Sequence, residues 1–405
     1  MAYEIEEAKR LVVQAGLDLI EKGLIARTWG NVSARISDTQ FVITPSGRAY
    51  EDLTPDEIVV VNIDDCSYEG DIKPSSEKGV HAAAYRHHPT VDFVIHTHQK
   101  AATIVSITGM EIRNVYPEFR DVLGDKVPCA AYAMSTTDSL RKKVERCIEM
   151  NPSARAIMMM HHGTVCMGDT YEHAFALAEN LEACCEKVIK DNYIRHSWET
   201  TYSDDKKRQF FLDKNEAGDM PECIPDLGSS VRNGNVFTLT VGDTTVDVDI
   251  ETGVGINGLA PKIEKLHRAI YNTEDCTMIR QLTTPDVVAV SCTGDGITPM
   301  IDDFAQIVGI DVKNCPWIDG STDECAKEIG DAIDNRNAVL IQGAGALITG
   351  NTEGDMQALD IIMNKQCQAI VDVDIFNRAH YVPKFECFLM RTVYLAKYSK
   401  KINEK

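Results

Sequence analysis

The sequence predicts an α/β protein made of two similar domains, each a central β-sheet covered by helices. Short apolar runs typical of strands alternate with longer segments of helical period, which implies a sheet flanked by helices. This scheme occurs twice in a chain of 405 residues, a length that itself favours two domains. A polar segment rich in Gly, Pro and Asp separates the two copies. We therefore expect domains at residues 1–199 and 235–405, with residues 200–234 as a linker.

The first copy shows its elements in a regular order. A helix opens the chain, because apolar side chains recur every three to four positions from Glu4 until Gly23 ends the pattern. The other expected helices cover residues 76–86, 139–150 and 170–191. Apolar runs bounded by turn residues predict strands within residues 40–47, 57–64, 91–98, 127–133 and 154–168.

The second copy repeats the rhythm of the first. "IMMMHHGTVCMGDTYEHAFALAEN" is echoed by "VLIQGAGALITGNTEGDMQALDII". Gly109 and Gly294 are 185 residues apart, and Gly163 and Gly345 are 182 apart, so the offset is nearly constant. This spacing favours an internal duplication over two unrelated helix-and-sheet domains. Residues 235–251 alternate polar and apolar side chains around "GD", which predicts a β-hairpin at the start of the second copy.

Composition excludes several classes of function. The net charge is −21, and a surface of that sign repels nucleic acid and anionic lipid. The chain starts with an acidic amphipathic segment, unlike a secretion signal, and its apolar runs are shorter than the roughly 20 residues of a membrane span. The thirteen cysteines include no CxxC pair, which suits buried thiols in a reducing compartment. We expect a cytoplasmic protein with neither nucleic-acid nor membrane partners.

Two histidines, His96 and His98, stand one residue apart in an apolar run that predicts a strand. Side chains at positions i and i+2 of a strand point to the same face, so the two imidazoles are expected to lie together. On its own the pair also fits two neighbouring core histidines. A zinc site takes four ligands, so a metal interpretation needs further candidates.

Two other segments supply such candidates. His161 and His162 end an apolar strand, and because neighbours in a strand face opposite ways, at most one of them serves. We favour His162, which stands next to Gly163. Glu77 lies at the start of a helix, where the helix dipole favours a carboxylate. Plain capping of that helix is the alternative explanation for Glu77.

The second copy provides an internal control for these histidines. Where the first copy has "IHTHQ" the second has "IRQLTTP", and where the first has "HHG" the second has "GAG". All three imidazoles are absent together while the apolar pattern around them stays, with Ala344 opposite His162. Core histidines with separate tasks are not expected to disappear as a set. The joint loss therefore favours one shared role, which we interpret as metal binding.

Five ordered motifs of the first copy match a known family. They are "GNVSAR", "VITPSGRAYEDL", "KPSSEKGVH", "VIHTHQ" and "MMHHGTV", within residues 3–195. With these motifs the first copy resembles the class II aldolase/adducin family, whose nearest named members are zinc-dependent L-fuculose-1-phosphate aldolases. The resemblance implies Zn²⁺, or another divalent transition metal, held by His96, His98 and His162. It also implies Glu77 as a further ligand or a nearby base.

The resemblance further implies a phosphate site and a catalytic tyrosine. The phosphate-binding residues would be Asn31, Ser46, Gly47, Ser75 and Ser76. Hydroxyl, amide and backbone donors suit an anion, and two of these serines begin a helix, although such residues are also common in turns. Tyr116 lies where family aldolases use a tyrosine from a neighbouring subunit as proton donor, at slightly different spacing.

The chain also departs from the family pattern. Typical members consist of one copy and form four-fold rings with sites between subunits, whereas this chain carries a second copy without the histidines. That copy shows no sequence equivalent of "GNVS" or "TPSG", and Pro261 and Glu264 only faintly echo Pro74 and Glu77. We expect a homo-oligomer in which the second copy takes a neighbour's place in a pseudo-symmetric assembly.

The function expected is that of a zinc-dependent aldolase, a lyase that cleaves a small phosphorylated ketose or related hydroxy-carbonyl compound. The metal would stabilise the enediolate and Glu77 would move the proton. A sugar-phosphate 4-epimerase is the first alternative, although family epimerases have aspartate where Glu77 stands. Dehydratases and decarboxylases on the same scaffold are the second alternative. A non-enzymatic adducin-like scaffold is the third, and its lack of zinc ligands separates it from this first copy.

Overall fold

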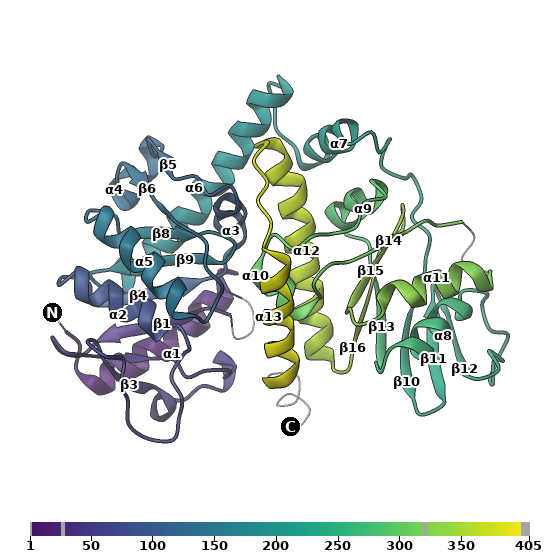
Figure 1. Cartoon of the computed structure of the whole chain (residues 1–405), viewed down its shortest axis with the longest axis horizontal. Coiled ribbons are helices and arrows are strands. Elements are labelled where there is room, and N and C mark those ends of the chain that lie inside the picture. Colours follow the sequence, from purple (N-terminus) through teal and green to yellow (C-terminus); the bar gives the residue numbers. More distant parts are fainter. Residues whose placement is uncertain (1, 26–28, 319–321, 398–405) are drawn as a thin grey trace. The chain divides into compact units, whose positions relative to one another are not determined.

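The computed structural model describes residues 2–25, 29–318 and 322–397 and divides the chain into two compact units, Met1–Asn192 and Tyr193–Lys405. Each unit is built around a seven-stranded sheet with helices packed against it (Figure 1). The fold class expected from the sequence, α/β with two domains of the same kind, is confirmed. Among the described residues, no helix combines the length and the apolar character required to cross a bilayer.

The sheet of the first unit has the strand order β3-β2-β1-β4-β9-β8-β7. Neighbouring strands run antiparallel, except β7 and β8, which are parallel. The strands are β1 (Asn31–Arg35), β2 (Gln40–Ile43), β3 (Val59–Asn62), β4 (Phe93–Thr97), β7 (Cys129–Ala130), β8 (Ala156–Met159) and β9 (Gly163–Gly168). A separate two-stranded sheet pairs β5 (Ile112–Arg113) with β6 (Lys126–Val127).

Helices α2 and α5 cover one face of this sheet, because their apolar side chains share a buried core with alternate residues of the strands. Val80 and Tyr85 of α2 and Val144 of α5 belong to this core, together with Val94 of β4. Helices α1 and α3 pack against other parts of the sheet. The helices are α1 (Ile5–Glu21), α2 (Lys78–His87), α3 (Lys100–Ile107), α4 (Pro117–Leu123), α5 (Asp138–Met150) and α6 (Tyr171–Ser197), with 3-10 turns η1 (Tyr50–Asp52) and η2 (Pro55–Glu57).

The second unit has the corresponding strand order β12-β11-β10-β13-β16-β15-β14, with only β14 and β15 parallel. Its strands are β10 (Ser229–Asn233), β11 (Val236–Val241), β12 (Thr244–Asp249), β13 (Met278–Leu282), β14 (Asn314–Cys315), β15 (Ala338–Ile341) and β16 (Gly345–Gly350). Its helices are α7 (Asp204–Lys214), α8 (Glu264–Thr273), α9 (Pro285–Cys292), α10 (Asp302–Ile307), α11 (Asp323–Ile333), α12 (Glu353–Ile375) and α13 (Lys384–Lys397).

The strand register shows that the two units are copies of one another. In the first unit His96 of β4 stands opposite Val165 of β9. In the second unit Gln281 of β13 stands opposite Leu347 of β16, at the same offsets that the two glycine pairs give. A register shift by one residue would turn every side chain to the other face, so agreement in register fixes the correspondence residue by residue. The duplication expected from the sequence is confirmed.

The segment 200–234 differs from the linker expected there. It contains helix α7 and strand β10, an interior strand of the second sheet. Helix α7 begins at Ser203, whose side chain accepts a hydrogen bond from the backbone N–H of Lys206, and it buries Phe211 and Leu212. The division between the units falls after Asn192, seven residues before the expected end of the first domain.

Candidate metal centre

Glu77, His96, His98 and His162 lie together in the first unit. Each offers one donor atom, and these atoms all lie within 4.8 Å of one another. The Glu77 carboxylate reaches two of the rings, with Oε2 3.0 Å from His96 Nε2 and Oε1 2.9 Å from His162 Nε2. The structure thus brings together the four side chains predicted as ligands, from three separate parts of the sequence.

Strand β4 places two of the imidazoles. His96 is its fourth residue and His98 follows its last, so both rings project to the same face, with their Nε2 atoms 2.9 Å apart. His96 Nδ1 donates a hydrogen bond to the carbonyl oxygen of Thr164 at 2.8 Å. Because that carbonyl only accepts, Nδ1 carries a proton, and Nε2 is the ring nitrogen that faces the cluster. This is the usual arrangement of a metal-binding histidine.

A tight turn between β8 and β9 positions the third imidazole, that of His162. His161 adopts a left-handed backbone conformation with φ of 67°, and the N–H of His162 bonds to the carbonyl of Met159 at 3.0 Å. The turn directs His161 toward the ring of Tyr132, 5.0 Å away, and His162 into the cluster. Gly163 follows, where an added Cβ would lie 2.2 Å from the carbonyl oxygen of Thr97. Only glycine therefore permits this approach of β9 to β4.

Glu77 sits at the N-terminal end of α2 and is held from several sides. Its side chain is 9% exposed. Burial alone raises the pKa of the Glu77 carboxyl, but the neighbouring His162 and His96 outweigh burial and hold that pKa well below its usual value. The Glu77 carboxylate is therefore an anion at neutral pH.

Asn31 joins the carboxylate to a buried polar network. Its Nδ2 lies 3.2 Å from Glu77 Oε2, and its Oδ1 lies 2.5 Å from His81 Nε2. The other ring nitrogen of His81 lies 2.6 Å from the hydroxyl of Ser33, which in turn lies 2.7 Å from the hydroxyl of Tyr85. His81 is fully buried, and burial lowers its pKa to about 3, so this imidazole is neutral.

The donor set fits a divalent transition metal. Three imidazole nitrogens and one carboxylate are the ligands that zinc and related ions take in proteins. The His96–His98 contact brings two ring nitrogens to 2.9 Å at a part-buried position, where a shared cation is a natural partner for both. In the described part of the chain, these four residues form the one group of histidine, cysteine and acidic side chains with this compactness.

The predicted phosphate-binding residues occupy two adjoining loops and one strand. Backbone hydrogen bonds join Ser46 N to Lys73 O at 2.9 Å and Ser75 N to Thr44 O at 3.0 Å, so the two loops lie side by side. Ser46, Gly47 and Ser76 are exposed there, and Ser75 is buried with its hydroxyl accepting from the N–H of Glu77. Asn31 of β1 is placed differently, since its amide is occupied by Glu77 and His81.

Tyr116 directly precedes α4. Its ring is half-buried, with the ammonium of Lys187 4.8 Å from the ring centre and Phe119 packed edge-on at 6.4 Å. The role of Tyr116 as a proton donor stays a prediction.

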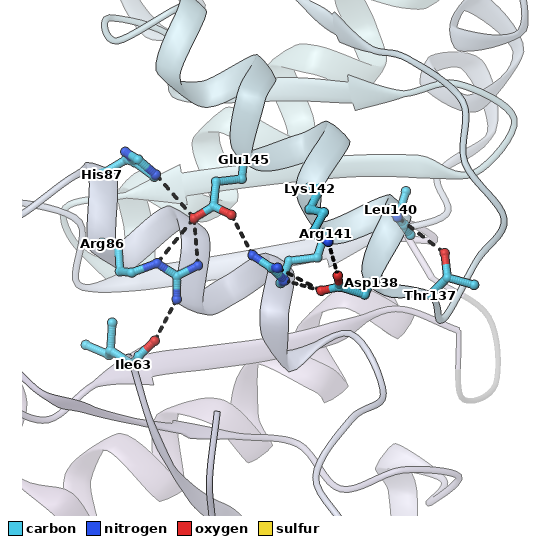
Figure 2. Close-up of polar contacts among 9 residues, drawn as sticks. All are labelled: Ile63, Arg86, His87, Thr137, Asp138, Leu140, Arg141, Lys142 and Glu145. Carbon is cyan, nitrogen blue, oxygen red and sulfur yellow. Dashed lines mark hydrogen bonds and ion pairs between the residues drawn. The ribbon is translucent and has the colours of Figure 1, made fainter. Parts of the chain in front are cut away.

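A pocket of about 380 Å³ lies between α2 and α5, with Ser76 in its lining. Figure 2 shows the Glu145 carboxylate between Arg86 and Arg141, with N–O distances of 2.7 and 2.6 Å. Arg141 also pairs with Asp138 at 2.7 Å. Because carboxylates already compensate both guanidinium groups, this wall is poorly suited to bind a phosphate. The Arg86–Glu145 pair instead joins α2 to α5, and the two pairs of Arg141 lie within α5.

The corresponding site of the second unit contains none of the four donors. By strand register and helix start, Glu77, His96, His98 and His162 correspond to Ile263, Gln281, Thr283 and Ala344. Glu264 is one position beyond the equivalent of Glu77 and pairs with Arg268 at 3.2 Å, so the faint echo of Glu77 in the sequence was misaligned.

The second unit nevertheless keeps the buried network. Ser230 Oγ lies 2.7 Å from His267 Nδ1 and 2.8 Å from the hydroxyl of Tyr271, as Ser33 does in the first unit. His267 Nε2 donates to the backbone carbonyl of Leu227 at 2.7 Å. "LGSSVR" is therefore the structural counterpart of "GNVSAR", which the sequence comparison missed. The two segments share a serine and an arginine two residues later, and this pattern was the signal that could have identified the match from the sequence.

Known proteins share both halves of the chain. A family model described as the class II aldolase and adducin N-terminal domain matches residues 10–189 and again residues 235–371. The chain belongs to this family. As a class II aldolase and adducin family member, it contains the domain twice, and among the described residues the cluster of histidines and glutamate lies in the first copy.

Curated relatives of this family member match part of its length. The L-fuculose phosphate aldolase of Escherichia coli (strain K12) is 32% identical over 186 residues, which are 46% of this chain and 84% of that protein. The L-ribulose-5-phosphate 4-epimerase UlaF of Salmonella paratyphi C (strain RKS4594) is 38% identical over 126 residues, 31% of this chain and 55% of its own. Among solved structures, an L-fuculose 1-phosphate aldolase aligns with 52% of this chain and 96% of its own, at 25% identity and a TM-score of 0.44.

Proposed function

We propose that the protein is a divalent-metal-dependent lyase, an aldolase that cleaves a small phosphorylated ketose or a related hydroxy-carbonyl compound. The observation that carries this proposal is the convergence of three imidazoles and one carboxylate within 4.8 Å. Two curated relatives at 30% identity or more are aldolases of sugar phosphates, one from Escherichia coli and one from Bacillus thuringiensis. Zinc is the metal that this donor set suits best.

The residues of the chain have separate tasks in this reaction. His96, His98 and His162 would hold the metal, which supplies a positive charge that polarises the substrate carbonyl and stabilises the enediolate. Glu77 is anionic and fixed beside two of the rings, so it is placed to carry the proton between substrate carbon and solvent. The Ser46 and Ser75–Ser76 loops would bind the phosphate end and orient the reacting carbons.

An epimerase that shifts a hydroxyl configuration by breaking and remaking a carbon–carbon bond is the second candidate. It is favoured by the relative named as an L-ribulose-5-phosphate 4-epimerase, which shares 38% identity over its matched part. A glutamate at position 77 favours the aldolase, since the family resemblance assigns aspartate to the epimerases. A dehydratase or decarboxylase would use the same donors on a different leaving group.

One experiment tests the metal and the activity together. Purified chain is incubated with phosphorylated ketoses, and the release of a three-carbon phosphate is measured beside bound metal by mass spectrometry. We expect one ion per chain, and loss of both ion and turnover in His96→Ala. The matched control is Gln281→Ala, the same position in the second unit, which should keep both. Retained metal with normal turnover in His96→Ala would contradict the assignment.

Tyr116 is proposed as a proton donor that acts on another copy of the chain. The family resemblance, in which a tyrosine in this region acts from a neighbouring subunit, supports a role in trans. Tyr116→Phe keeps the ring beneath Lys187 and removes only the hydroxyl, so folding and metal content should be unchanged while turnover falls. Mixing Tyr116→Phe chains with His96→Ala chains should restore part of the activity. A mixture as inactive as its parents would count against this role and against shared sites.

A further inference from the structure

The comparison of the two units resolves an ambiguity at Asn31. An amide presents oxygen on one side and nitrogen on the other, and a neutral imidazole can carry its proton on either ring nitrogen. The positions of the atoms in one unit alone therefore do not decide which group donates and which accepts in each hydrogen bond. In the second unit the polarity is fixed. His267 Nε2 faces a backbone carbonyl, which can only accept, so Nε2 carries the proton and Nδ1 accepts from Ser230.

The first unit has the same serine, histidine and tyrosine at matching distances. Ser33 lies 2.6 Å from His81 Nδ1, against 2.7 Å for the Ser230–His267 pair. The same tautomer then places the proton of His81 on Nε2, opposite Asn31. The Asn31 atom that meets it must be the oxygen, and the amide N–H groups must face Glu77.

We propose that His81 is a positioning residue of the metal centre, because its Nε2–H fixes the Asn31 amide so that an N–H donor faces the Glu77 carboxylate. His81 is fully buried and is not itself one of the four clustered donors. The equivalent histidine of the second unit, His267, donates to the backbone carbonyl of Leu227, and this bond leads to no carboxylate. The network therefore supports the fold in both units and reaches a functional carboxylate in only one. This inference rests on the proposed metal site.

The consequence of losing His81 follows from the polarity of the amide. Without the Nε2–H, the Asn31 oxygen loses its donor, and the amide is no longer held where its N–H meets the Glu77 carboxylate. The carboxylate would then lose a donor and part of the restraint that keeps it between His96 and His162. Loss of a group that holds a metal ligand in place costs about 10–100-fold in metal affinity.

Matched substitutions in the two units separate this role from a purely structural one. His81→Leu and His267→Leu each remove a buried imidazole and its two hydrogen bonds, so both should lower the melting temperature of the metal-free full-length chain. Only His81→Leu should weaken Zn²⁺ binding, by about 10–100-fold in calorimetric titration, and alter the visible absorption of bound Co²⁺. His81→Gln, whose amide N–H can replace the Nε2–H, should restore most of the affinity.

The outcomes are distinct. Equal Zn²⁺ affinity in His81→Leu and wild type, or an equal loss in His267→Leu, overturns the positioning role and leaves the metal site standing. A wild-type chain that binds neither Zn²⁺ nor Co²⁺ overturns the metal site and this inference with it. If His81→Leu does not fold, Ser33→Ala and its control Ser230→Ala replace the pair. A loss of Zn²⁺ affinity in Ser33→Ala alone supports the role, and unchanged affinity overturns it.

Discussion

Gln281 stands at the strand position in the second unit that His96 holds in the first. Its Nε2 donates to the backbone carbonyls of Pro225 and Ala344, each at 2.8 Å, and its Oε1 accepts from the N–H of Leu227 at 2.8 Å. The glutamine thus ties together three backbone segments around the place where the first unit gathers its imidazoles. In the second unit the Gln281 amide thus links neighbouring backbone segments by hydrogen bonds, as a bound cation would link side chains in the first unit.

The Gln281→Ala variant should lose stability without losing function. Three hydrogen bonds to backbone groups disappear, and partly buried groups without partners cost about 1–3 kcal/mol in total. Urea unfolding of the full chain at neutral pH measures the change, and the bound metal and turnover should equal those of the wild type. A loss of metal in this variant would show that the second unit contributes to the centre directly.

Glu77→Gln should separate proton transfer from metal binding. The amide keeps the size of the side chain but cannot accept a proton at neutral pH, so we expect turnover to fall about 10²–10⁴-fold. Zn²⁺ affinity should fall about 10–100-fold, as in His81→Leu, but three imidazoles remain, so the metal content at saturating Zn²⁺ should stay near that of the wild type. Glu264→Gln, at the start of the equivalent helix, is the matched control and should leave turnover unchanged. Parallel losses of metal and turnover would instead make Glu77 primarily a ligand.

The ion pair between Lys207 and Asp372 should be a strong determinant of stability in the second unit. The two side chains are 2% and 0% exposed, and they join α7 to α12. Removing one partner leaves a buried charge alone, so Lys207→Met should destabilise the chain by about 3–5 kcal/mol. The double variant Lys207→Met/Asp372→Leu should recover most of this loss. Calorimetric unfolding of both variants provides the comparison, and a double variant no better than the single one would refute the pairing argument.

His267 should make the second unit sensitive to acid. Burial lowers the pKa of His267 from 6.5 to about 4. Above pH 6.5 the imidazole is neutral in both the folded and the unfolded chain. Between pH 6.5 and about pH 4, His267 is protonated in the unfolded chain but stays neutral in the folded chain. Stability is therefore fully present above pH 6.5 and is lost as the pH falls toward 4, by about 3 kcal/mol.

The variant His267→Gln tests this pH dependence. Its free energy of unfolding, measured in urea with a chelator present, should fall less steeply between pH 6.5 and pH 4 than that of the wild type. His81 remains in both proteins, so the difference between the two curves reports His267. Parallel curves would show that the folded chain accommodates the protonated ring.

The positions of the site residues were predictable from the sequence where they depend only on the geometry of a single strand. The spacing of His96 and His98 suffices to place two rings on one face, because strand periodicity requires it. The absence of all three histidines from the second copy pointed to His162 as their companion. Sequence alone did not reveal that the amide of Asn31 faces Glu77 and His81, since those contacts depend on how α2 packs on β1.

The fold was predictable in class and in its repeat, and less so in segments with charged sequences. "SDDKKRQFF" has the composition of a solvated segment, yet Lys207 within it is buried. Its partner Asp372 lies 165 residues further along the chain, and only tertiary packing brings them together. The second copy's first strand was missed because Ser229–Asn233 shares only its serine and arginine pattern with the first copy.

Gly163 has a counterpart in Gly345, where an added Cβ would lie 2.2 Å from the carbonyl oxygen of Leu282. Both glycines let one strand pass close to another, and one of them does so where no imidazoles gather. A glycine of this kind can therefore be intolerant to replacement without any part in catalysis. In a saturation screen scored by cell growth, position 345 should look as essential as position 163. A map of catalytic residues drawn from that screen would then extend into the half of the chain where these imidazoles are replaced by other side chains.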